Sequence, residues 1–446
     1  MKRQGLIALL TAEVVSLVGS RMSMIALPWF TLVTTGSAAR TGIVAFVEML
    51  PYVLACGLGG PLLDRLGHRR VSVAADLGSA AALIAVPVLH AGGQLHFGVL
   101  ITLIGVVGLL RGLGDTAKRV VFPETVAASG MEMTRATSLH DGLGRLATLL
   151  GAPLASVLIA TLDASTVLAI DAATFLLAGV IVAVLVPGVR RVVAAVTDRE
   201  AYLPALRAGL AFLRRDRLML GITLLLFVTN LADAAYGTVL APFWASDVIG
   251  SPVALGVLSG VFAVGAVLGN VVFTAVAPRV PRFAVFAVGF LIAGAPRFAI
   301  LSVADALWIV YVVSFVAGVS ISAVNPILGA VSYERVPEHL RARVLGLGQA
   351  IGWGGMPLGS LLAGWAVQGF GLNVALMLFG GAYLAVTVLP FVSPTWRQMN
   401  RPPTDQPSTT DQPSTTDQPS TTDQTSAPAE PAHPAAPGTP AEPVPR

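Results

Sequence analysis

Long apolar stretches, broken by short polar turns, run along most of this chain. Stretches of roughly 18–25 apolar residues match a hydrocarbon core of ~30 Å, because an α-helix rises about 1.5 Å per residue. The pattern therefore predicts an all-α membrane protein with about twelve transmembrane helices. The expected spans are residues 6–33, 41–62, 71–91, 97–117, 138–160, 165–187, 218–240, 253–277, 283–303, 305–330, 343–367 and 370–392.

The composition agrees with a membrane protein. Of the 446 residues, 55% are hydrophobic and 12% are charged, whereas a soluble domain carries roughly 25% charged residues. The apolar run after Lys2 and Arg3 continues to about Val33 without a convincing cleavage site, so we expect a retained first helix rather than a signal peptide. Cys56 is the single cysteine, so we expect neither a disulfide framework nor a metal site.

Basic residues are distributed unevenly between the expected loops. If the N-terminus lies in the cytoplasm, the outer loops carry only Arg40, whereas the inner segments carry nearly all the other loop lysines and arginines. This asymmetry follows the positive-inside rule. We therefore expect a multi-pass protein of the plasma (inner) membrane with both termini in the cytoplasm. Topology also explains the net charge of +4, so no nucleic-acid partner is expected.

Local repeats indicate two related halves. The stretch from Gly142 to Ser156 matches the stretch from Gly346 to Ser360 at a constant offset, six expected helices apart. We expect two pseudo-symmetric six-helix bundles at residues 1–187 and 218–392, joined by a cytoplasmic linker at 188–217. A parallel repeat of this kind is a transporter architecture, with the substrate site between the halves.

Two further segments lie outside the bundles. Leucines at 3–4 spacing with arginines on the other face predict an amphipathic helix over Tyr202–Arg217. It is either a surface helix that contacts anionic lipid or a solvated linker. Residues 393–446 contain three copies of TDQPST and a Pro-rich and Ala-rich end, so we expect a disordered cytoplasmic tail.

The loop between the second and third expected helices carries a motif. Its sequence is GPLLDRLGHRR, from Gly60 to Arg70. It resembles the G-x-L-x-D-R-x-G-R-R-R signature of the major facilitator superfamily and departs from it at His68. The resemblance implies that this loop holds the cytoplasmic side closed in one of two states. The motif residues assigned to this gating role are Gly60, Asp64, Arg65, Gly67, Arg69 and Arg70.

The fourth and fifth expected helices carry a second resemblance. Gly144, Gly151 and Pro153 are similar to the glycine-and-proline motif of proton-coupled antiporters in that superfamily, which implies export rather than uptake. Arg111 is a candidate for the antiporters' helix-four arginine, but Asp115 replaces the glycine found four residues later. Either Arg111 takes part in proton coupling, or it is neutralised by Asp115 within one helix.

Eight ionisable residues fall at membrane depth, where each costs a few kcal/mol unless it is paired or hydrated. They are Glu13, Arg21, Glu48, Asp76, Arg145, Asp171, Asp233 and Arg297. Arg21, Glu48 and Asp171 fall at similar height in the outer half, as judged from the rise per residue. One hypothesis is that Arg21 pairs with Glu48 or Asp171 in one state and that protonation of a carboxylate releases it in the other. The alternative is a static ion pair that fixes helix register.

For the remaining ionisable residues at membrane depth, the sequence predicts a location or a partner but no role in proton coupling. Asp233 lies near Asn230, and we expect both to face the central cavity. Glu13 and Asp76 lie near the cytoplasmic edge and could contact Arg65, Arg69 or Arg145, and for Asp76 we expect such a structural contact. Arg297 has no obvious partner in the sequence.

Together these features predict a secondary active transporter that exports a small amphipathic compound, such as a drug, an antibiotic or a siderophore-like molecule, by proton antiport. The alternatives are an importer of a small polar nutrient and a membrane receptor. The sequence contains neither a phosphate-binding P-loop nor an enzyme-like constellation, so the proton motive force is expected in place of a cofactor. The expected partners are the substrate and the lipid bilayer, and we expect a monomer.

Overall fold

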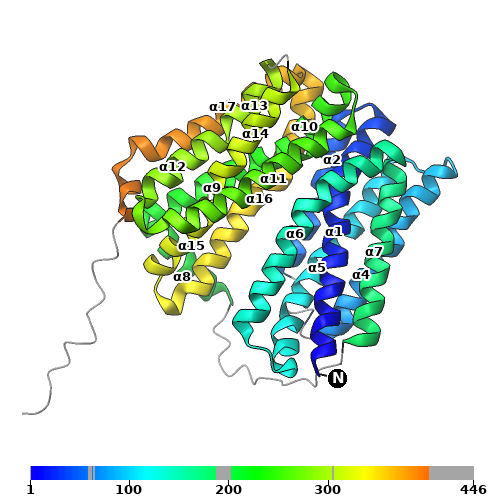
Figure 1. The fold of residues 1–446 in the computed structure, drawn as a ribbon, viewed down its shortest axis with the longest axis horizontal. Coiled ribbons are helices and arrows are strands. Elements are labelled where there is room, and N and C mark those ends of the chain that lie inside the picture. Colours follow the sequence, from blue (N-terminus) through cyan, green and yellow to red (C-terminus); the bar gives the residue numbers. More distant parts are fainter. Residues whose placement is uncertain (1, 59–62, 64–65, 187–201, 304–305, 401–446) are drawn as a thin grey trace, which may run out of the picture. The chain divides into compact units, whose positions relative to one another are not determined.

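The computed structural model describes residues 2–58, 63, 66–186, 202–303 and 306–400. All regular structure in these ranges is helical. The chain divides into the units Met1–Pro402 and Pro403–Arg446, and the second lies outside the described residues. The first unit contains two groups of long helices, which Figure 1 shows in blue to green and in green to orange.

The first group, called the N-half below, consists of six long helices. They are α1 (Lys2–Thr35), α2 (Ala38–Leu58), α4 (His68–Ala91), α5 (Phe97–Ser129), α6 (Met133–Thr161) and α7 (Ala164–Leu185). Local chemistry fixes several of their ends. The Asp163 side chain accepts a hydrogen bond from the backbone N–H of Thr166 at 2.7 Å and so caps α7. Gly130 ends α5 with a left-handed φ of 72°, a conformation that glycine adopts without strain.

The second group, called the C-half, begins after the short helix α8 (Tyr202–Arg215). Several of its spans are interrupted helices. Its elements are α9 (Arg217–Ala235), η1 (Tyr236–Leu240), α10 (Ala241–Phe243), η2 (Trp244–Ile249), α11 (Pro252–Val276), η3 (Ala277–Arg279), α12 (Arg282–Ala293), α13 (Ala295–Val303), α14 (Leu307–Ile321), α15 (Val324–Arg335), α16 (Glu338–Phe370), α17 (Leu372–Val392) and η4 (Pro394–Asn400). The span from Arg217 to Ile249 is one continuous helix. It contains two π-helical segments, η1 and η2, whose turns are wider than those of an α-helix.

Eleven stretches of the described residues are helical, long and apolar enough to cross a bilayer. This confirms a polytopic helical membrane protein. The helix α16 covers the predicted span 343–367 but is not among the eleven, so the number twelve stays a prediction.

The helices extend further at one end than hydropathy alone predicts. The expected span 97–117 continues as α5 to Ser129, because Val121, Phe122 and Val126 are buried against the start of α1. Residues that the sequence placed in a loop, including Lys118, therefore lie inside the helical bundle.

The segments outside the bundles also differ from expectation. The helix α8 ends at Arg215, and its Leu213 is buried in the core that α8 shares with α16. The predicted tail begins later than residue 393, because Pro394–Asn400 forms the helix η4 with Trp396 and Met399 buried. The stretches 187–201 and 401–446 lie outside the described residues.

Two glycine turns mark opposite ends of the helices. The Gly36 end of the molecule contains the α1–α2 turn, where Gly36 has a φ of 63°. The Gly67 end contains the start of α4, where Gly67 has a φ of 89°. By the positive-inside pattern, the Gly36 end is the predicted outer side and the Gly67 end is the predicted cytoplasmic side.

Candidate transport site

A buried ion pair lies between α2 and α5 in the N-half. Nη1 of Arg111 lies 2.6 Å from Oε1 of Glu48, and the two side chains are 15% and 18% exposed. Glycines allow this contact, because a Cβ on Gly112 would lie 2.6 Å from the carbonyl oxygen of Tyr52. The close crossing of α2 and α5 brings the carboxylate to the guanidinium at membrane depth.

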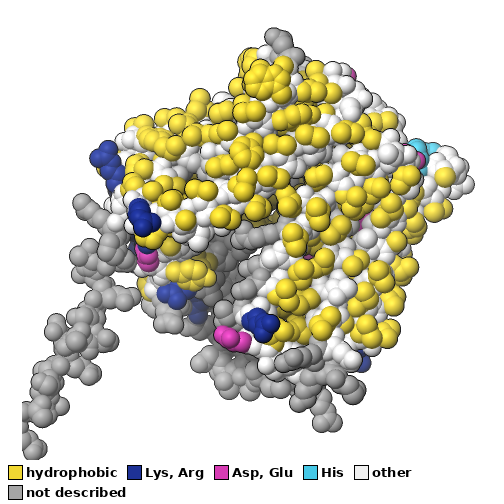
Figure 2. Space-filling model, in the orientation of Figure 1, with side chains coloured by type: hydrophobic (Ala, Val, Ile, Leu, Met, Phe, Trp, Pro, Cys, Tyr) yellow, Lys and Arg dark blue, Asp and Glu magenta, His cyan; other side chains and the backbone are white. Residues whose placement is uncertain are grey.

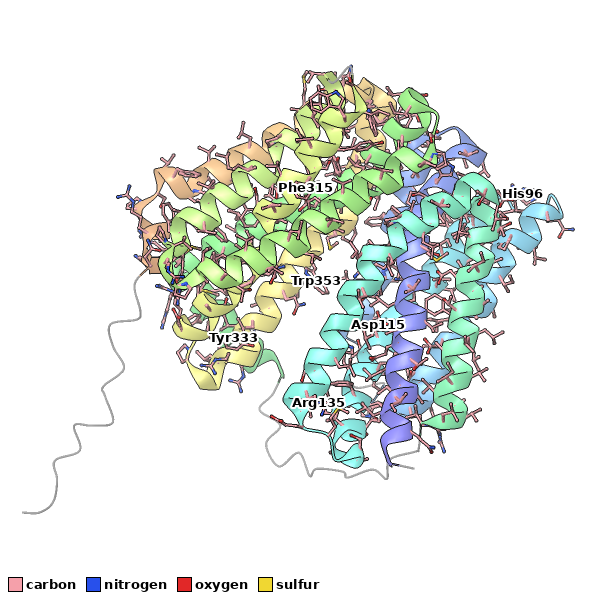
Figure 3. The ribbon with its side chains drawn as sticks, viewed as in Figure 1. His96, Asp115, Arg135, Phe315, Tyr333 and Trp353 are labelled. Carbon is pink, nitrogen blue, oxygen red and sulfur yellow. The ribbon has the colours of Figure 1, made fainter. Side chains whose placement is uncertain are left out.

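Asp115 has a different partner from the one that the sequence offered. Its Oδ2 accepts a hydrogen bond from the Tyr52 hydroxyl at 3.1 Å, while Arg111 lies over the Tyr52 ring at 5.9 Å. Among the described side chains, Arg111 therefore makes its direct ion pair with Glu48 and not with Asp115. Glu48 of α2 contacts Arg111 of α5 across the helix interface. Tyr52 of α2 contacts both Arg111, through its ring, and Asp115, through its hydroxyl. Figure 3 labels Asp115 within the N-half.

Asp171 on α7 is bound by hydroxyl groups. Ser23 donates a short hydrogen bond to Oδ2, and Thr174 donates one to Oδ1 at 3.1 Å. Asp171 is 1% exposed. In the described part of the chain it makes no ion pair, so it differs from Glu48 in having only neutral hydrogen-bond partners.

Arg21 on α1 does not make the predicted pair with Glu48 or Asp171. Its only hydrogen bond among the described residues runs from Nη1 to the Met24 sulfur at 3.4 Å, and its Nε is buried without a partner. The physical reason is that both carboxylates already have donors: Glu48 accepts from Arg111 of α5, and Asp171 accepts from Ser23, which lies on α1 itself. The stem of Arg21 packs against Gly151, which has no side chain to displace it.

The C-half contains its own buried ion pair. Nη2 of Arg297 on α13 lies 2.5 Å from Oδ1 of Asp233 on α9. The guanidinium lies 5.1 Å from each of the Tyr236 and Phe262 ring centroids, and its Nε donates to the carbonyl oxygen of Ala293 at 2.5 Å. Four groups therefore contact the Arg297 guanidinium. Its ionic partner, which the sequence did not reveal, is Asp233.

The two members of this pair differ in exposure. The Arg297 side chain is 10% exposed and the Asp233 side chain is 38% exposed. Asn230, one turn earlier on α9, donates from Nδ2 to the carbonyl oxygen of Gly352 at 3.1 Å. Asn230 therefore ties α9 to α16 while Asp233 remains accessible.

Two other charged residues in the N-half have partners that sequence reasoning missed. Asp76 pairs with Lys118 at 2.8 Å instead of with an arginine. Lys118 was assigned to a loop, and only the extension of α5 to Ser129 turns it toward α4. Glu13 lies 3.0 Å from Nε2 of His140 on α6. Sequence reasoning also missed the hydroxyl groups of Ser23 and Thr174, which both donate to Asp171.

Half of the predicted gating motif can be located. Gly60, Asp64 and Arg65 lie outside the described residues. Gly67 forms the turn before α4, and Arg69 donates from Nη2 to the carbonyl oxygen of Ala183 on α7 at 2.5 Å. Arg70 is exposed.

The helix α6 carries the antiporter-like residues and lies at the boundary between the halves. Gly151 contacts Arg21 of α1, whereas Pro153 faces the C-half, where a Cβ on Gly260 would lie 2.8 Å from Cγ of Pro153. The nearest side-chain atom to Gly144 is Cδ2 of Leu17, which a Cβ on Gly144 would meet at 3.8 Å. These residues thus set the packing of α6 on two neighbours.

The halves contact each other closely near the Gly36 end. A Cβ on Gly364 of α16 would lie 2.7 Å from the carbonyl oxygen of Ala38 on α2, and one on Gly42 would lie 2.5 Å from that of Ser360. Ser37 also donates to the Gln368 side chain at 3.2 Å. In Figure 3, Trp353 lies on α16 beside the space between the halves, between these contacts and the Gly67 end. The described residues contain no cluster of His, Cys, Asp and Glu suited to a metal ion.

These features define a polytopic helical transporter with two bundles and a charged layer at membrane depth. A family model described as transmembrane secretion effector matches residues 1–415. The chain belongs to this family of the major facilitator superfamily.

Known relatives and structures agree with that assignment. The multidrug efflux pump Tap of Mycolicibacterium fortuitum is 27% identical over 410 residues, covering 90% of this chain and 98% of the pump. Macrolide efflux protein A of Streptococcus pyogenes is 21% identical, covering 84% and 93%. Among solved structures, the nucleoside transporter NupG matches with a TM-score of 0.71, 14% identity and coverage of 87% and 98%. A bacterial homologue of the lysosomal transporter Spinster, titled as inward-facing and unoccupied, matches with a TM-score of 0.64, 14% identity and coverage of 90% and 97%. These structural matches show the fold alone.

Proposed function

We propose that this protein exports a small amphipathic compound from the cytoplasm by proton antiport with alternating access. The observation that carries the proposal is the charged layer of the N-half. It contains three carboxylates, on Glu48, Asp115 and Asp171, and two guanidinium groups, on Arg21 and Arg111. Among the described side chains of this layer, one negative charge is therefore left without a positive partner, and a bound proton or a cationic group of the substrate would balance it.

Asp171 is the carboxylate to which we assign the exchangeable proton. An ionised carboxylate at membrane depth is costly without a cationic partner. Glu48 has such a partner in Arg111, whereas the partners of Asp171 in the described part of the chain are the hydroxyls of Ser23 and Thr174. Arg21 has no carboxylate partner among the described residues and lies on the neighbouring helix α1. Arrival of Arg21 at an ionised Asp171 would favour one arrangement of the helices, and protonation of Asp171 would release it.

Alternating access is proposed from the position of the contacts between the halves. Backbone-to-backbone packing of α2 on α16 joins the halves near the Gly36 end. Rocking of the halves about a pivot nearer the middle of the helices would break these contacts, open the Gly36 end and close the Gly67 end. The names of the relatives, which are multidrug and macrolide efflux pumps, support export of an amphipathic compound by this chain.

The test is accumulation in cells that lack their own efflux pumps. Cells that express the protein are loaded with a panel of fluorescent dyes and antibiotics, with and without a protonophore. We expect lower accumulation of at least one compound, and we expect the protonophore to abolish the difference. The variant Asp171→Asn should lose this export, whereas Glu124→Gln, an exposed carboxylate on α5, should retain it. Higher accumulation in the expressing cells would indicate import and would contradict the proposal, as would export that resists the protonophore.

A further inference from the structure

A polar stripe runs along one face of α4 inside the N-half. It consists of Ser72, Asp76 and Ser79, whose spacing of four and three residues places them on the same side of the helix. Their exposed fractions are 1%, 3% and 1%. The stripe is roughly 10 Å long, as judged from a rise of ~1.5 Å per residue. It is separate from the charged layer and is called the α4 stripe.

Each residue of the α4 stripe has a side-chain oxygen without a hydrogen-bond partner among the described protein groups. These atoms are Oγ of Ser72, Oδ2 of Asp76 and Oγ of Ser79, and all three are buried. A buried polar atom without a partner costs about 1–3 kcal/mol. Buried water molecules bind to such atoms, with about three hydrogen bonds each. The α4 stripe therefore has the chemistry of an internal water site.

The helices α5 and α7 pack against α4 at this stripe (Figure 1). A Cβ on Gly179 of α7 would lie 3.2 Å from Cβ of Asp76, and one on Gly114 of α5 would lie 3.8 Å from Oδ1 of Asp76. Nζ of Lys118, which is 4% exposed, lies 2.8 Å from the same Oδ1. Lys118 thus holds one carboxylate oxygen and leaves Oδ2 available for water or for a proton.

The α4 stripe lies between the charged layer and the Gly67 end. On α5, Asp115 of the charged layer precedes Lys118 by about one helical turn. On α7, Asp171 lies ~12 Å along the helix axis from Gly179, which packs on the stripe. At its other end, Ser72 lies about one turn inside the start of α4. The stripe therefore spans much of the distance between the charged layer and the predicted cytoplasmic side.

The proton that the export cycle assigns to Asp171 needs an internal path. Asp171 is 1% exposed. Figure 2 shows hydrophobic side chains over much of the N-half and charged side chains near the Gly67 end. A proton carried by water does not cross such an apolar surface, because a charge is costly in hydrocarbon. Carboxylates inside the bundle are the groups that relay protons at membrane depth, and Asp76 is a carboxylate with a free oxygen on the way to the Gly67 end.

We propose that the α4 stripe is a water site through which the exchanged proton passes between the charged layer and the Gly67 end, with Asp76 as its carrier. This inference rests on the proposed export function and adds the route of its proton. A hydronium ion at the site transfers one proton to Oδ2 of Asp76, which leaves a water molecule and a neutral carboxyl group. The carboxyl group then returns the proton to water nearer Ser72 and becomes a carboxylate again.

Lys118 is the positioning residue of this site. Its ammonium group keeps Oδ1 of Asp76 occupied, so the proton binds at Oδ2. Two further carboxylates, Asp115 of α5 and Glu13 of α1, act on Asp76 through their charge. While Asp76 holds the proton, these two carboxylates offset the positive charge of Lys118. The pair returns to its neutral, ionic form when the proton leaves.

The first test detects the proton and does not depend on transport. Full-length protein in lipid nanodiscs is titrated from neutral to acidic pH, while infrared difference spectra record the C=O stretch of protonated carboxyl groups. We expect a band that appears on acidification, remains in Asp171→Asn and is absent from the double variant Asp76→Asn/Lys118→Met. The double variant removes both charges together, so neither is left buried without its partner. The frequency of the band should change in Ser72→Ala/Ser79→Ala, which lacks the hydroxyls that bind the water.

The second test separates proton movement from substrate movement in proteoliposomes, with the panel dye that the wild type exports most strongly. Under an imposed pH gradient, Asp76→Asn/Lys118→Met should export the dye about a hundredfold more slowly. Ser72→Ala/Ser79→Ala should be about fivefold slower, as expected for a lost hydrogen bond. Exchange of dye for dye at equal pH moves no net proton, so both variants should exchange at the wild-type rate. In the control Thr387→Val, which removes a 0% exposed hydroxyl that donates to the carbonyl oxygen of Tyr383 at 2.8 Å, both rates should stay unchanged.

Several results would overturn the proposal. An infrared spectrum of Asp76→Asn/Lys118→Met that equals the wild-type spectrum would show that Asp76 takes up no proton. Gradient-driven export at the wild-type rate by this variant would show that the path is not used, and equal loss of export and exchange would assign the pair a static structural role. If the double variant fails to fold, as gel filtration would reveal, Ser72→Ala/Ser79→Ala decides both tests. Absence of protonophore-sensitive export by the wild type would count against the proposed function, and the infrared test would still decide whether Asp76 takes up a proton.

Discussion

The ion pair between Glu48 and Arg111 offers the sharpest test of the charged layer. Its atoms are 2.6 Å apart, a distance at which two unit charges attract by about 6 kcal/mol at an effective dielectric constant of about 20. Desolvation opposes most of this attraction, and removal of one partner from a buried pair costs about 3–5 kcal/mol. Glu48→Gln and Arg111→Gln should each therefore lower the thermal unfolding midpoint in detergent by about 5–15 °C. The double variant should be less destabilised than the sum of the two, because neither charge is then left unpaired.

The assay is a double-mutant cycle on purified protein, with unfolding followed by intrinsic fluorescence or by light scattering. Glu334→Gln serves as the control, because its pair with Arg282 lies 2.7 Å apart but at the Gly67 end, with the side chains 35% and 41% exposed. We expect the control to change the midpoint by no more than about 2 °C. Strictly additive losses in the Glu48 and Arg111 cycle would refute the reasoning, since they would show no coupling between the two charges.

Three further predictions concern contacts that position the site. Gly364→Leu should disrupt the α2–α16 seam, because its Cβ would lie 2.7 Å from the carbonyl oxygen of Ala38; transport should fall, and normal transport would argue against close packing there. Trp396→Ala should cost about 3–5 kcal/mol in unfolding experiments, because the 6% exposed ring stacks on Phe286 at 5.9 Å, whereas Arg397→Ala should be nearly neutral. Asp216 accepts from the backbone N–H groups of Leu218 and Met219 and pairs with Arg335 at 2.9 Å. Asp216→Asn keeps the cap, so it should lower the unfolding midpoint less than Asp216→Ala does, and equal effects of the two variants would contradict the capping role.

Hydropathy alone predicted the fold well, because the bilayer forces each span into a helix of defined length. The helix ends were harder to predict. Hydropathy falls after residue 117, yet α5 continues because Phe122 and Val126 are buried against α1. Burial of this kind depends on a distant segment, so no local pattern reveals it. The same reasoning applies to η4, where Trp396 stacks on Phe286 of α12 and faces Gly221 of α9.

The candidate site was predictable in its residues but not in its pairs. Rarity at membrane depth was enough to single out Glu48, Asp171 and Asp233. Which cation each meets depends on helix rotation and on glycine-mediated crossings, such as the one at Gly112 that brings α5 onto α2. The rise per residue predicted that Arg21 and Glu48 lie at the same depth. The rotation of the helices about their axes, which the rise does not predict, brings Arg111 and not Arg21 to Glu48.

The two π-helical turns after Asp233 bear on how this chain is compared with its relatives. A π-helical turn closes with i→i+5 hydrogen bonds, so each of η1 and η2 holds an additional residue within an otherwise continuous span. Removal of one such residue would restore α-helical winding and rotate everything after it by about 100° relative to Asp233. Single-residue gaps in an alignment at Tyr236–Leu240 or Trp244–Ile249 should therefore be interpreted as changes of helix phase inside a transmembrane span, and not as variation in loop length.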